Sequence, residues 1–587
     1  MKCVLIAPPW PLFNRPSIQL ACLSAFLKRH VPEIGCAVFH PYLELYQKIG
    51  LRLYDVISES SWISEAFGGM LLEPGHEQSQ IWLIKKSLGR RSRRRLFNSS
   101  KEILKVRDCL KETLDVFLER HDWSQYDLCG ITVSLNQLTS GLYLAREIKA
   151  LAPSIKVVIG GAGVPEEVGQ ELLSQFEFID YIVSGEGEKG LLEIVEGIKK
   201  GKPAQRGVIR GEIIEDLNEL PIPDFTPYFA ELATLRPSLR FSPVIPVEFS
   251  RGCFWGRCSF CNLNVQWKGY RRKSWQRLLK EVDFLSKRYK TLDFAFMDNA
   301  LPPKEAKEFF DQVSLLGRDF NFFGELRASF SRKDAHLMKK AGLNIVQVGI
   351  EALSNSLLKR LRKGRTVMDN LASMRHLLEA GIELQGNLIM DFPGTSQEEV
   401  EETLSILKYA KYFRPLKPVS FWLGYGSPVF NDPKSFGIKA KRPHRFYSRI
   451  FPGRTFDVTM VCEYSGTLKQ DRMLWKQVRE YIQDWQKYWV DASKNGPPLS
   501  FRDGGDFVLI RQVMSQGQVL HHRLSQASRS IFLDTLEPIA LEELIQRHSG
   551  ISPEKILSFL KELQQKELIY CDGNKVLGLP VRIREKW

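Results

Sequence analysis

The sequence predicts an α/β protein of three parts: an N-terminal Rossmann-like domain, a partial (β/α)6 barrel of the TIM type, and a small C-terminal α+β domain with a winged-helix pattern. Short apolar runs alternate with helical patterns in the first part, and a second series of such units follows a proline-rich connector. This alternation is typical of parallel sheets covered by helices. We expect the domain at residues 1–205, the connector at 206–242, the barrel at 243–470 and the last domain at 471–587.

The composition indicates a soluble globular protein. The chain has 587 residues, 43% of them hydrophobic and 26% charged, so it can bury three or four cores. No stretch reaches the ~20 apolar residues that cross a bilayer, and the apolar N-terminus ends in prolines, so we expect no membrane contact. Most of the ten cysteines are scattered without a framework of spacings, which predicts reduced thiols and a cytoplasmic location.

The net charge of +15 is partly concentrated in residues 84–101, IKKSLGRRSRRRLFNSSK. Such a run can bind nucleic acid or an acidic partner, but it has no interleaved aromatic residues and matches no recognisable nucleic-acid module. We therefore expect a solvated face or loop, and we do not expect nucleic acid as a partner.

Four buried strands are expected in the N-terminal domain, each followed by a loop and an amphipathic stretch. They are KCVLIAPPW (2–10), YDLCGITVS (126–134), IKVVIGGAG (155–163) and FIDYIVSGEGE (178–188). In an open parallel sheet a large ligand binds at the carboxyl ends of the strands, where glycines let the backbone approach it closely. Four such ends in one domain favour a cofactor over ordinary tight turns.

The second series predicts about six strands, spaced by helical patterns, which is the signature of a parallel barrel. The strands are VIPVEFSRGC (244–253), LDFAFMDNA (292–300), NFFGELRAS (321–329), NIVQVGIEAL (344–353), ELQGNLIMDFPG (383–394) and VSFWLGYG (419–426). The segment SRGCFWGRCSFC follows the first strand. A barrel places its chemistry at such strand ends.

Cys253, Cys258 and Cys261 stand within nine positions of each other. A structural zinc site takes four ligands, commonly as two separated pairs, and no second Cys/His pair follows downstream. Three thiolates instead suit a 4Fe-4S cluster with one iron left open for a ligand. We therefore expect these three cysteines to be the metal ligands.

From these cysteines onward, residues 243–430 resemble the radical SAM superfamily, in which the open iron binds the amino and carboxylate groups of S-adenosylmethionine. Four residues rather than the usual three separate the first two cysteines, which lengthens the loop and removes no ligand. The resemblance implies S-adenosylmethionine contacts from the loop and the strand ends, and no catalytic side chain beyond the cofactors. The implied contacts are Phe260, beside the adenine, and Glu325, Glu351, Ser354, Lys363 and Asn387.

The N-terminal domain is similar to the cobalamin-binding domain that precedes the barrel in one branch of this superfamily, because SLN, GGAG and GEGE end its strands in that order. The cobalamin contacts implied are Pro8, Trp10, Ser134, Leu135, Asn136, Gly160, Gly161, Gly185, Glu186 and Gly187. The Asp-x-His-x-x-Gly motif that supplies a histidine to cobalt is absent, and His40 lacks its spacing. We expect methylcobalamin without a histidine ligand, its lower face covered by a residue such as Trp10 or Leu135.

More narrowly, RGCFWGRCSFCNLN (251–264) and VGIEALSNSLLKRLRKGRT (348–366) resemble enzymes that mature ribosomally made peptides (RiPPs). The implied function is C-methylation of an unactivated peptide carbon through a 5'-deoxyadenosyl radical, with electrons from an external donor such as flavodoxin or ferredoxin. The alternative is an enzyme of the same branch that acts on a small-molecule natural product by methylation, cyclisation or ring rearrangement. A cobalamin sensor would leave the barrel glutamates and Lys363 without a role.

The C-terminal segment predicts two helices, LEELIQRH (541–548) and EKILSFLKEL (554–563), and then two short strands around an Asp-Gly-Asn turn in ELIYCDGNKVLGLP (567–580). This layout is similar to that of small domains that bind peptide leaders, and a structural cap on the barrel is equally compatible with it. DNA binding is not expected, because the segment is not strongly basic.

Overall fold

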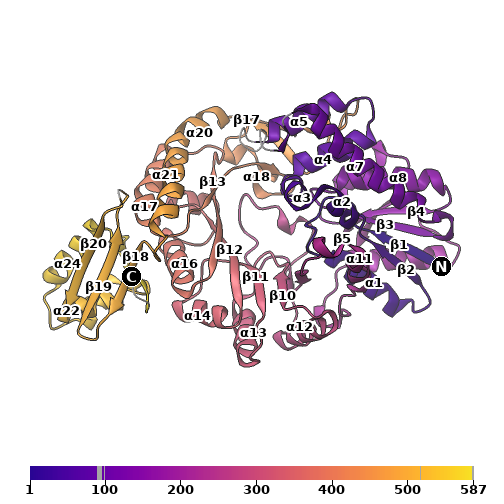
Figure 1. Cartoon of the computed structure of the whole chain (residues 1–587). Coiled ribbons are helices and arrows are strands. Elements are labelled where there is room, and N and C mark those ends of the chain that lie inside the picture. The colour runs from indigo at the N-terminus through magenta and orange to yellow at the C-terminus, as the bar shows by residue number, and fades with distance from the viewer. Residues whose placement is uncertain (89–95, 98, 516, 585–587) are drawn as a thin grey trace.

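The computed structural model describes residues 1–88, 96–97, 99–515 and 517–584. Of the basic run at 84–101, where we expected a solvated face or loop, residues 89–95 and 98 lie outside the described residues, while residues 84–87 and 100–101 belong to helices. Figure 1 shows three parts in a row, with the N-terminal domain at one end, the barrel in the middle and the C-terminal domain beyond the barrel.

The N-terminal domain contains a parallel sheet of six strands in the order β2-β1-β3-β4-β5-β6. The strands are β1 (Lys2–Ile6), β2 (Gly35–Phe39), β3 (Leu128–Thr132), β4 (Lys156–Gly160), β5 (Tyr181–Gly185) and β6 (Gly207–Gly211). The four expected strands are present, while the edge strands β2 and β6 escape the hydrophobic pattern because they are largely half-buried or exposed. β6 also carries the sheet past the boundary expected at residue 205.

Helices cover both faces of this sheet, and a helical insertion separates β2 from β3. The covering helices are α1 (Ile18–His30), α8 (Leu138–Leu151), α9 (Glu166–Gln175) and α10 (Gly187–Lys199). The insertion consists of α2 (Tyr42–Ile49), α3 (Leu51–Ser58), α4 (Ser61–Leu72), α5 (Glu77–Ser87) and α7 (Ser100–Glu119). α4 packs against α8, so the insertion adds a helical layer to one side of the domain (Figure 1).

The barrel is open and has six parallel strands in the order β14-β13-β12-β11-β10-β7, which confirms the expected number of units. They are β7 (Ile245–Val247), β10 (Asp293–Phe296), β11 (Asn321–Leu326), β12 (Leu343–Glu351), β13 (Glu383–Met390) and β14 (Lys417–Ser420). The outer helices are α12 (Trp275–Tyr289), α13 (Pro303–Leu315), α14 (Arg332–Lys340), α16 (Val367–Ala380) and α17 (Gln397–Ala410).

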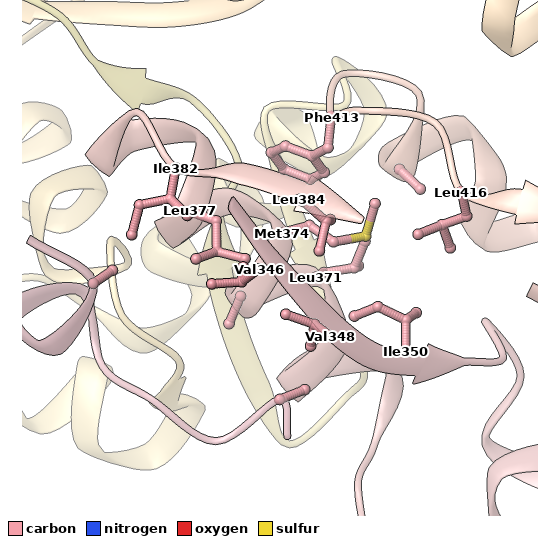
Figure 2. Packing of buried hydrophobic residues seen from close by; sticks show 14 of the residues in the cluster. Val346, Val348, Ile350, Leu371, Met374, Leu377, Ile382, Leu384, Phe413 and Leu416 are labelled. Atoms are coloured by element: carbon pink, nitrogen blue, oxygen red, sulfur yellow. The ribbon is translucent and has the colours of Figure 1, made fainter. Parts of the chain in front are cut away.

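Alternation along β12 fixes which side chains reach the interior of the barrel. Val346, Val348 and Ile350 are buried and pack with Leu371, Met374 and Leu377 of α16 (Figure 2). Each such side chain contributes roughly 1.5–3 kcal/mol when it is buried. Because successive residues of a strand point to opposite faces, Gly349 and Glu351 lie on the other face, toward the barrel interior.

After β14 the chain makes an excursion from the barrel toward the N-terminal domain. It holds the three-stranded sheet of β15 (Leu423–Gly424), β17 (Val461–Ser465) and β16 (Ala440–Pro443), with α18 (Pro428–Asn431) and α19 (Tyr447–Ile450). α19 packs on α4 and α5, and Arg454 pairs with Glu73 at 2.7 Å. The excursion therefore fixes the barrel to the helical insertion.

The boundary expected at residue 470 falls inside α20 (Leu468–Leu474), and α21 (Lys476–Ala492) packs on α17 of the barrel. The C-terminal unit therefore begins later than expected, with an antiparallel meander that the sequence patterns do not predict. Its strands are β18 (Leu499–Asp503), β19 (Phe507–Val513) and β20 (Val519–Ser525), and β24 (Val581–Arg582) adds to β18.

The winged-helix pattern lies between β20 and β24 and agrees with the sequence. It runs through α22 (Gln526–Asp534), β21 (Ile539–Ala540), α23 (Leu541–Arg547), α24 (Pro553–Gln565), β22 (Ile569–Cys571) and β23 (Lys575–Gly578). Arg375 of α16, fully buried, donates to the Pro580 carbonyl oxygen at 3.0 Å. The C-terminal unit thus covers an outer helix of the barrel.

Candidate functional site

The three cysteines are half-buried free thiols on the loop after β8 (Ser250–Arg251). Burial raises the pKa of Cys258 and takes that of Cys261 to about 11, while the Lys363 ammonium acts to lower both. A thiolate at Cys253 would also act to raise the pKa of the other two thiols, so the three cysteines are neighbours in space. Three thiols facing a cation suit an anionic iron-sulfur cluster. Among the described residues, no three His, Cys, Asp or Glu side chains are placed so that they could hold a single metal ion.

Hydrogen bonds from Ser259 tie the cysteine loop to the turn after α15 (Asn355–Arg360). Its backbone N–H donates to the Leu361 carbonyl at 3.0 Å, and its hydroxyl donates to the Arg360 carbonyl at 3.0 Å. Ser259 is fully buried, so water does not compete for these two bonds. The loop and the turn are therefore held at a fixed separation.

Trp255, in the lengthened spacer, makes a further link to the same turn. Its indole Nε1 donates to the Arg362 carbonyl at 2.9 Å, and its ring covers Gly364, where a Cβ would lie 2.2 Å from ring atoms. The φ of Gly364 is +64°, so glycine is required on both counts. The Arg327 guanidinium lies 4.5 Å from the centroid of the indole ring and donates to the Lys363 carbonyl. The longer spacer thus anchors the loop to the turn that carries Lys363.

Lys363 and Glu351 form a nearly buried ion pair beside the cysteines. The Lys363 Nζ atom lies 3.1 Å from the Glu351 Oε1 atom, with the side chains 7% and 14% exposed. The same Nζ lies 5.8 Å from the Phe260 ring centroid. A Cβ at Gly349 would lie 2.4 Å from Nζ, so the absence of a side chain there gives the ammonium its room. Phe260, Glu351 and Lys363, all implied by the family resemblance, are brought together.

Glu325 and Asn387 lie on the strands that flank this pair. Burial and the charge of Glu351 raise the pKa of Glu325, on β11, to about 7. Asn387 is half-buried on β13, and the register there pairs Glu351 with Leu388, the next residue along the strand. Neighbouring parallel strands therefore bring these side chains to the same end of the barrel.

Ser354 does not fit its expected role, because its side chain serves the local structure. It is fully buried, accepts the backbone N–H of Leu357 at 3.0 Å as the N-cap of α15, and donates to the Glu402 carboxylate at 2.5 Å. The hydroxyl is therefore committed to these partners. We correct the expected contact of this side chain with S-adenosylmethionine to a helix-capping role.

A cavity of about 370 Å³ lies between the two large sheets, bounded by strand ends of the N-terminal domain and by residues 262–263 and 265–267 of the loop after the cysteines. Six of the ten residues expected to contact cobalamin line it: Leu135, Gly160, Gly161, Gly185, Glu186 and Gly187. The φ of Gly161 is +119°, and a Cβ there would lie 2.4 Å from the Val133 carbonyl oxygen. The glycines expose backbone to the cavity, which suits the close approach of a large planar cofactor.

Leu135 is apolar, 42% exposed and directed to this cavity, while its neighbours hold the loop in place. The Ser134 hydroxyl donates to the Gln137 Oε1 atom at 2.8 Å, and Gln137 Nε2 donates to the Pro8 carbonyl at 2.8 Å. Asn136 is hydrogen-bonded to the connection between α3 and α4. Pro8, Ser134 and Asn136 are therefore loop supports in this structure, rather than the expected lining residues.

Trp10 is fully buried and lies outside the cavity lining, so it does not cover a cofactor face as expected. Its ring centroid lies 5.3 Å from that of Tyr54 and 5.9 Å from that of Phe67, both on the helical insertion. The sequence patterns do not reveal these aromatic partners. His40 is also buried outside the lining, with its Nδ1 atom 3.3 Å from the Glu231 carboxylate.

Glu186 and Glu188 of the GEGE turn reach across to the barrel. Arg251, two residues before Cys253, lies 2.6 Å from each carboxylate and is 4% exposed, and Arg271 lies 2.5 Å from Glu186. Glu186 thus lines the cavity and also joins the two domains. The sequence patterns do not identify Arg251 and Glu188 as functional residues. The signal that could have found them is the pair of glutamates at one strand end together with an arginine in the cysteine segment.

Comparison with known proteins agrees with this geometry. Residues 247–407, which contain the cysteines and the Lys363–Glu351 pair, match the radical SAM superfamily. These residues therefore form a radical SAM domain within the chain. An uncharacterized methyltransferase of Pyrococcus horikoshii is 28% identical over 48% of this chain and 64% of its own length. A hopanoid C-3 methylase of Methylococcus capsulatus is 26% identical over 49% of this chain and 57% of its own length. The match thus spans less than two thirds of either relative.

Two solved structures share the overall fold of this chain. The methyltransferase TsrM of Kitasatospora setae, with cobalamin and a [4Fe-4S] cluster bound, covers 96% of this chain and 98% of its own, with a TM-score of 0.54 and 15% identity. The cobalamin-dependent radical enzyme OxsB, with aqua-cobalamin bound, covers 97% of this chain and 80% of its own, with a TM-score of 0.53 and 15% identity. The likeness extends over all three parts of this chain and shows that it shares the fold of these two enzymes.

None of the described helices is long and apolar enough to cross a lipid bilayer.

Proposed function

We propose that the chain is a cobalamin-dependent radical SAM C-methyltransferase. One observation supports this above all: the glycine-lined cavity of the N-terminal domain is also lined by the loop that follows the three cysteines, through residues 262–263 and 265–267. A methyl donor in that cavity would face the site where a substrate radical forms. The free thiols suit a reducing compartment, for which we propose the cytoplasm.

The residues present fit both cofactors. When bound, the cluster with S-adenosylmethionine supplies a 5'-deoxyadenosyl radical and methylcobalamin supplies the methyl group. Cys253, Cys258 and Cys261 would hold the cluster, and Glu325 and Glu351 can accept hydrogen bonds from an ammonium group of S-adenosylmethionine.

Three further parts of the chain position these groups. Lys363 holds Glu351 in place and adds positive charge beside the cysteines. Leu135 would place an apolar side chain against a cobalamin bound in the cavity. The ion pairs of Arg251 with Glu186 and Glu188 close the interface between the domains, which limits the access of water to a radical.

For the substrate we propose a ribosomally made peptide, recognised in part by the C-terminal unit. β20 is an edge strand, because the order of its sheet is β20-β19-β18-β24. An extended peptide can add to such an edge through main-chain hydrogen bonds. The contacts of Arg375 and the Pro580 carbonyl hold the unit on the barrel and leave this edge on the far side from α16.

A small-molecule substrate is the second candidate. A related TsrM structure contains tryptophan as substrate and covers 82% of this chain, with a TM-score of 0.54 and 16% identity. The three-part architecture therefore does not by itself require a peptide.

Two measurements separate these candidates. Co-expression with a candidate precursor peptide, followed by mass spectrometry, should show the mass of one added methyl group that depends on cobalamin supply. Amide hydrogen exchange should show protection of β20 on addition of the precursor, while β24, at the other edge, serves as the internal control. Methylation of a small molecule, with unchanged exchange in β20, would favour the second candidate.

A further inference from the structure

Four cations without acidic partners surround Trp255 on the barrel surface. Arg257, Lys359 and Arg362 are exposed, Arg365 is half-buried, and all four line one shallow depression with Trp255. Within the part of the chain that the structure describes, none of these four cations forms an ion pair. We call this set, Trp255 with its four cations, the basic face.

The depression holds one carboxylate, and that group is already engaged. Asp369 accepts hydrogen bonds from the backbone N–H of Thr366 at 2.9 Å and from its hydroxyl at 3.1 Å, as part of the cap of α16. The basic face is therefore positively charged beyond what its own side chains can balance. Elsewhere on the barrel many surface cations have partners, such as Lys287 with Asp283 at 2.7 Å.

The basic face adjoins the cysteines but not the cofactor cavity. Trp255 stands between Cys253 and Cys258, and its indole is hydrogen-bonded to the Arg362 carbonyl. The residues that line the depression and those that line the cavity have no member in common. The cysteine loop therefore has two sides, one toward the cavity and one toward solvent through the basic face.

We propose that the basic face is the docking site of an acidic one-electron carrier protein. This rests on the proposed function, because that chemistry consumes an electron from outside the chain. The reduced carrier gives one electron to the cluster and is itself oxidised by one electron, and no covalent bond forms or breaks in that step. Electron-transfer complexes bury small interfaces and depend on complementary charge, which the basic face supplies next to the ligand loop.

The test uses the full-length, cluster-loaded protein and an acidic flavodoxin as the probe. The variant Arg257→Glu/Lys359→Glu/Arg362→Glu reverses three charges of the face. The matched control Lys290→Glu/Lys340→Glu/Lys417→Glu reverses three exposed, unpaired cations near the other ends of the strands. At low ionic strength we expect about a tenfold or greater loss of flavodoxin affinity in the first variant and little change in the control.

A second readout separates docking from catalysis. Reduction of the cluster by reduced flavodoxin, followed by visible absorbance without any substrate, should slow in the first variant, while reduction by dithionite should stay at the wild-type rate. Because neither measurement involves methyl transfer, failure of the proposed methylation would leave this result unaffected.

Three outcomes would overturn the proposal. The first is flavodoxin binding by the charge-reversed variant that equals binding by the control. The second is wild-type binding that does not weaken with salt. The third is an equally tight, equally charge-dependent binding of a single-stranded oligonucleotide, which would identify a general polyanion site. If charge reversal prevents cluster loading, Arg257→Gln/Arg362→Gln takes its place, and wild-type affinity in that variant would equally contradict the proposal.

Discussion

The Nη2 atom of Arg251 lies 2.6 Å from the Oε1 atom of Glu188, so a guanidinium beside the cysteine loop is paired with a carboxylate of the N-terminal sheet. Glu186 and Glu248 pair with the same guanidinium, at 2.6 and 2.9 Å. Three carboxylates thus share one buried cation, and Glu186 has Arg271 as a second partner. The cost of removing that cation is set by the desolvated charges it would leave behind.

The first prediction is that Arg251→Met destabilises the protein by about 3–5 kcal/mol, the usual effect of removing one partner from a buried ion pair. Urea unfolding of the apoprotein, followed by tryptophan fluorescence, measures it. The control is Arg442→Met, which removes a 77% exposed arginine paired with Glu463 and should cost less than about 1 kcal/mol. Equal losses in the two variants would contradict the role given to Arg251.

A second prediction concerns pH. Burial acts to raise the pKa of Glu186, but the hydrogen bond from Arg271 and the charge of Arg251 outweigh it, so the pKa lies below its usual 4.5. Such a carboxylate stabilises the folded state at pH values above the pKa that it has in the unfolded chain. That contribution is lost as the pH falls through the lower pKa that the group has in the folded protein. The stability difference between wild type and Glu186→Gln should therefore shrink below about pH 4.5. A stability difference between the two proteins that stays constant as the pH falls into this acidic range would contradict the prediction.

Third, Gly349→Ala should displace the Lys363 ammonium, because the new Cβ would lie 2.4 Å from Nζ. The variant keeps both charges but loses the charge-assisted contact between Lys363 and Glu351. We therefore expect S-adenosylmethionine to bind about tenfold more weakly. Equilibrium binding to the cluster-loaded protein measures it. Gly550→Ala, where a Cβ meets no atom within 4 Å, is the control. Wild-type affinity in Gly349→Ala would show that the position of Nζ does not matter.

The fourth prediction tests the link between Trp255 and the turn at Gly364. Trp255→Phe keeps a ring and loses the hydrogen bond to the Arg362 carbonyl, while Gly364→Ala drives the ring away. The measurement is the shift of the reduced cluster's electron paramagnetic resonance spectrum on addition of S-adenosylmethionine. We expect this shift to change modestly in Trp255→Phe and more strongly in Gly364→Ala. Because a purely structural role would change stability alone, unaltered spectra in both variants would exclude a positioning role.

Finally, changing Cys253, Cys258 and Cys261 together to Ala should abolish the visible charge-transfer absorbance of the cluster and the cleavage of S-adenosylmethionine. The far-ultraviolet circular dichroism should stay close to that of wild type, because the cysteines lie on a loop outside the barrel strands. Full cleavage by this triple variant would overturn the assignment of the ligands.

The sequence predicts the strands of the two parallel sheets well where hydrophobic runs are continuous, as in β1 and β4. It fails at β2 and β6, because edge strands carry little apolar signal. It also fails for Ser354, since a hydroxyl that caps a helix and one that meets a ligand look identical in a motif. Trp10 is a similar case, because its aromatic partners belong to an insertion that no pattern places over it.

The electrostatic relationships are the least predictable part. Arg251 and Glu188 are far apart in sequence and belong to different domains, so neither residue indicates the other. The basic face is likewise assembled from the cysteine loop, from α15 and from the segment that joins α15 to α16. By contrast, Lys363 and Glu351 follow from local motifs, and the structure brings them to 3.1 Å.

The pairing of Arg251 and Arg271 with Glu186 and Glu188 also restricts how such proteins can be recombined. A hybrid that takes its cofactor-binding half from one relative and its barrel from another would join surfaces whose buried charges were never selected together. Unless both arginines and both glutamates are transferred as one set, the hybrid would bury unbalanced charge at the seam, next to the ligand loop. Exchange of the halves between homologues should therefore succeed or fail on these four side chains before any substrate contact matters.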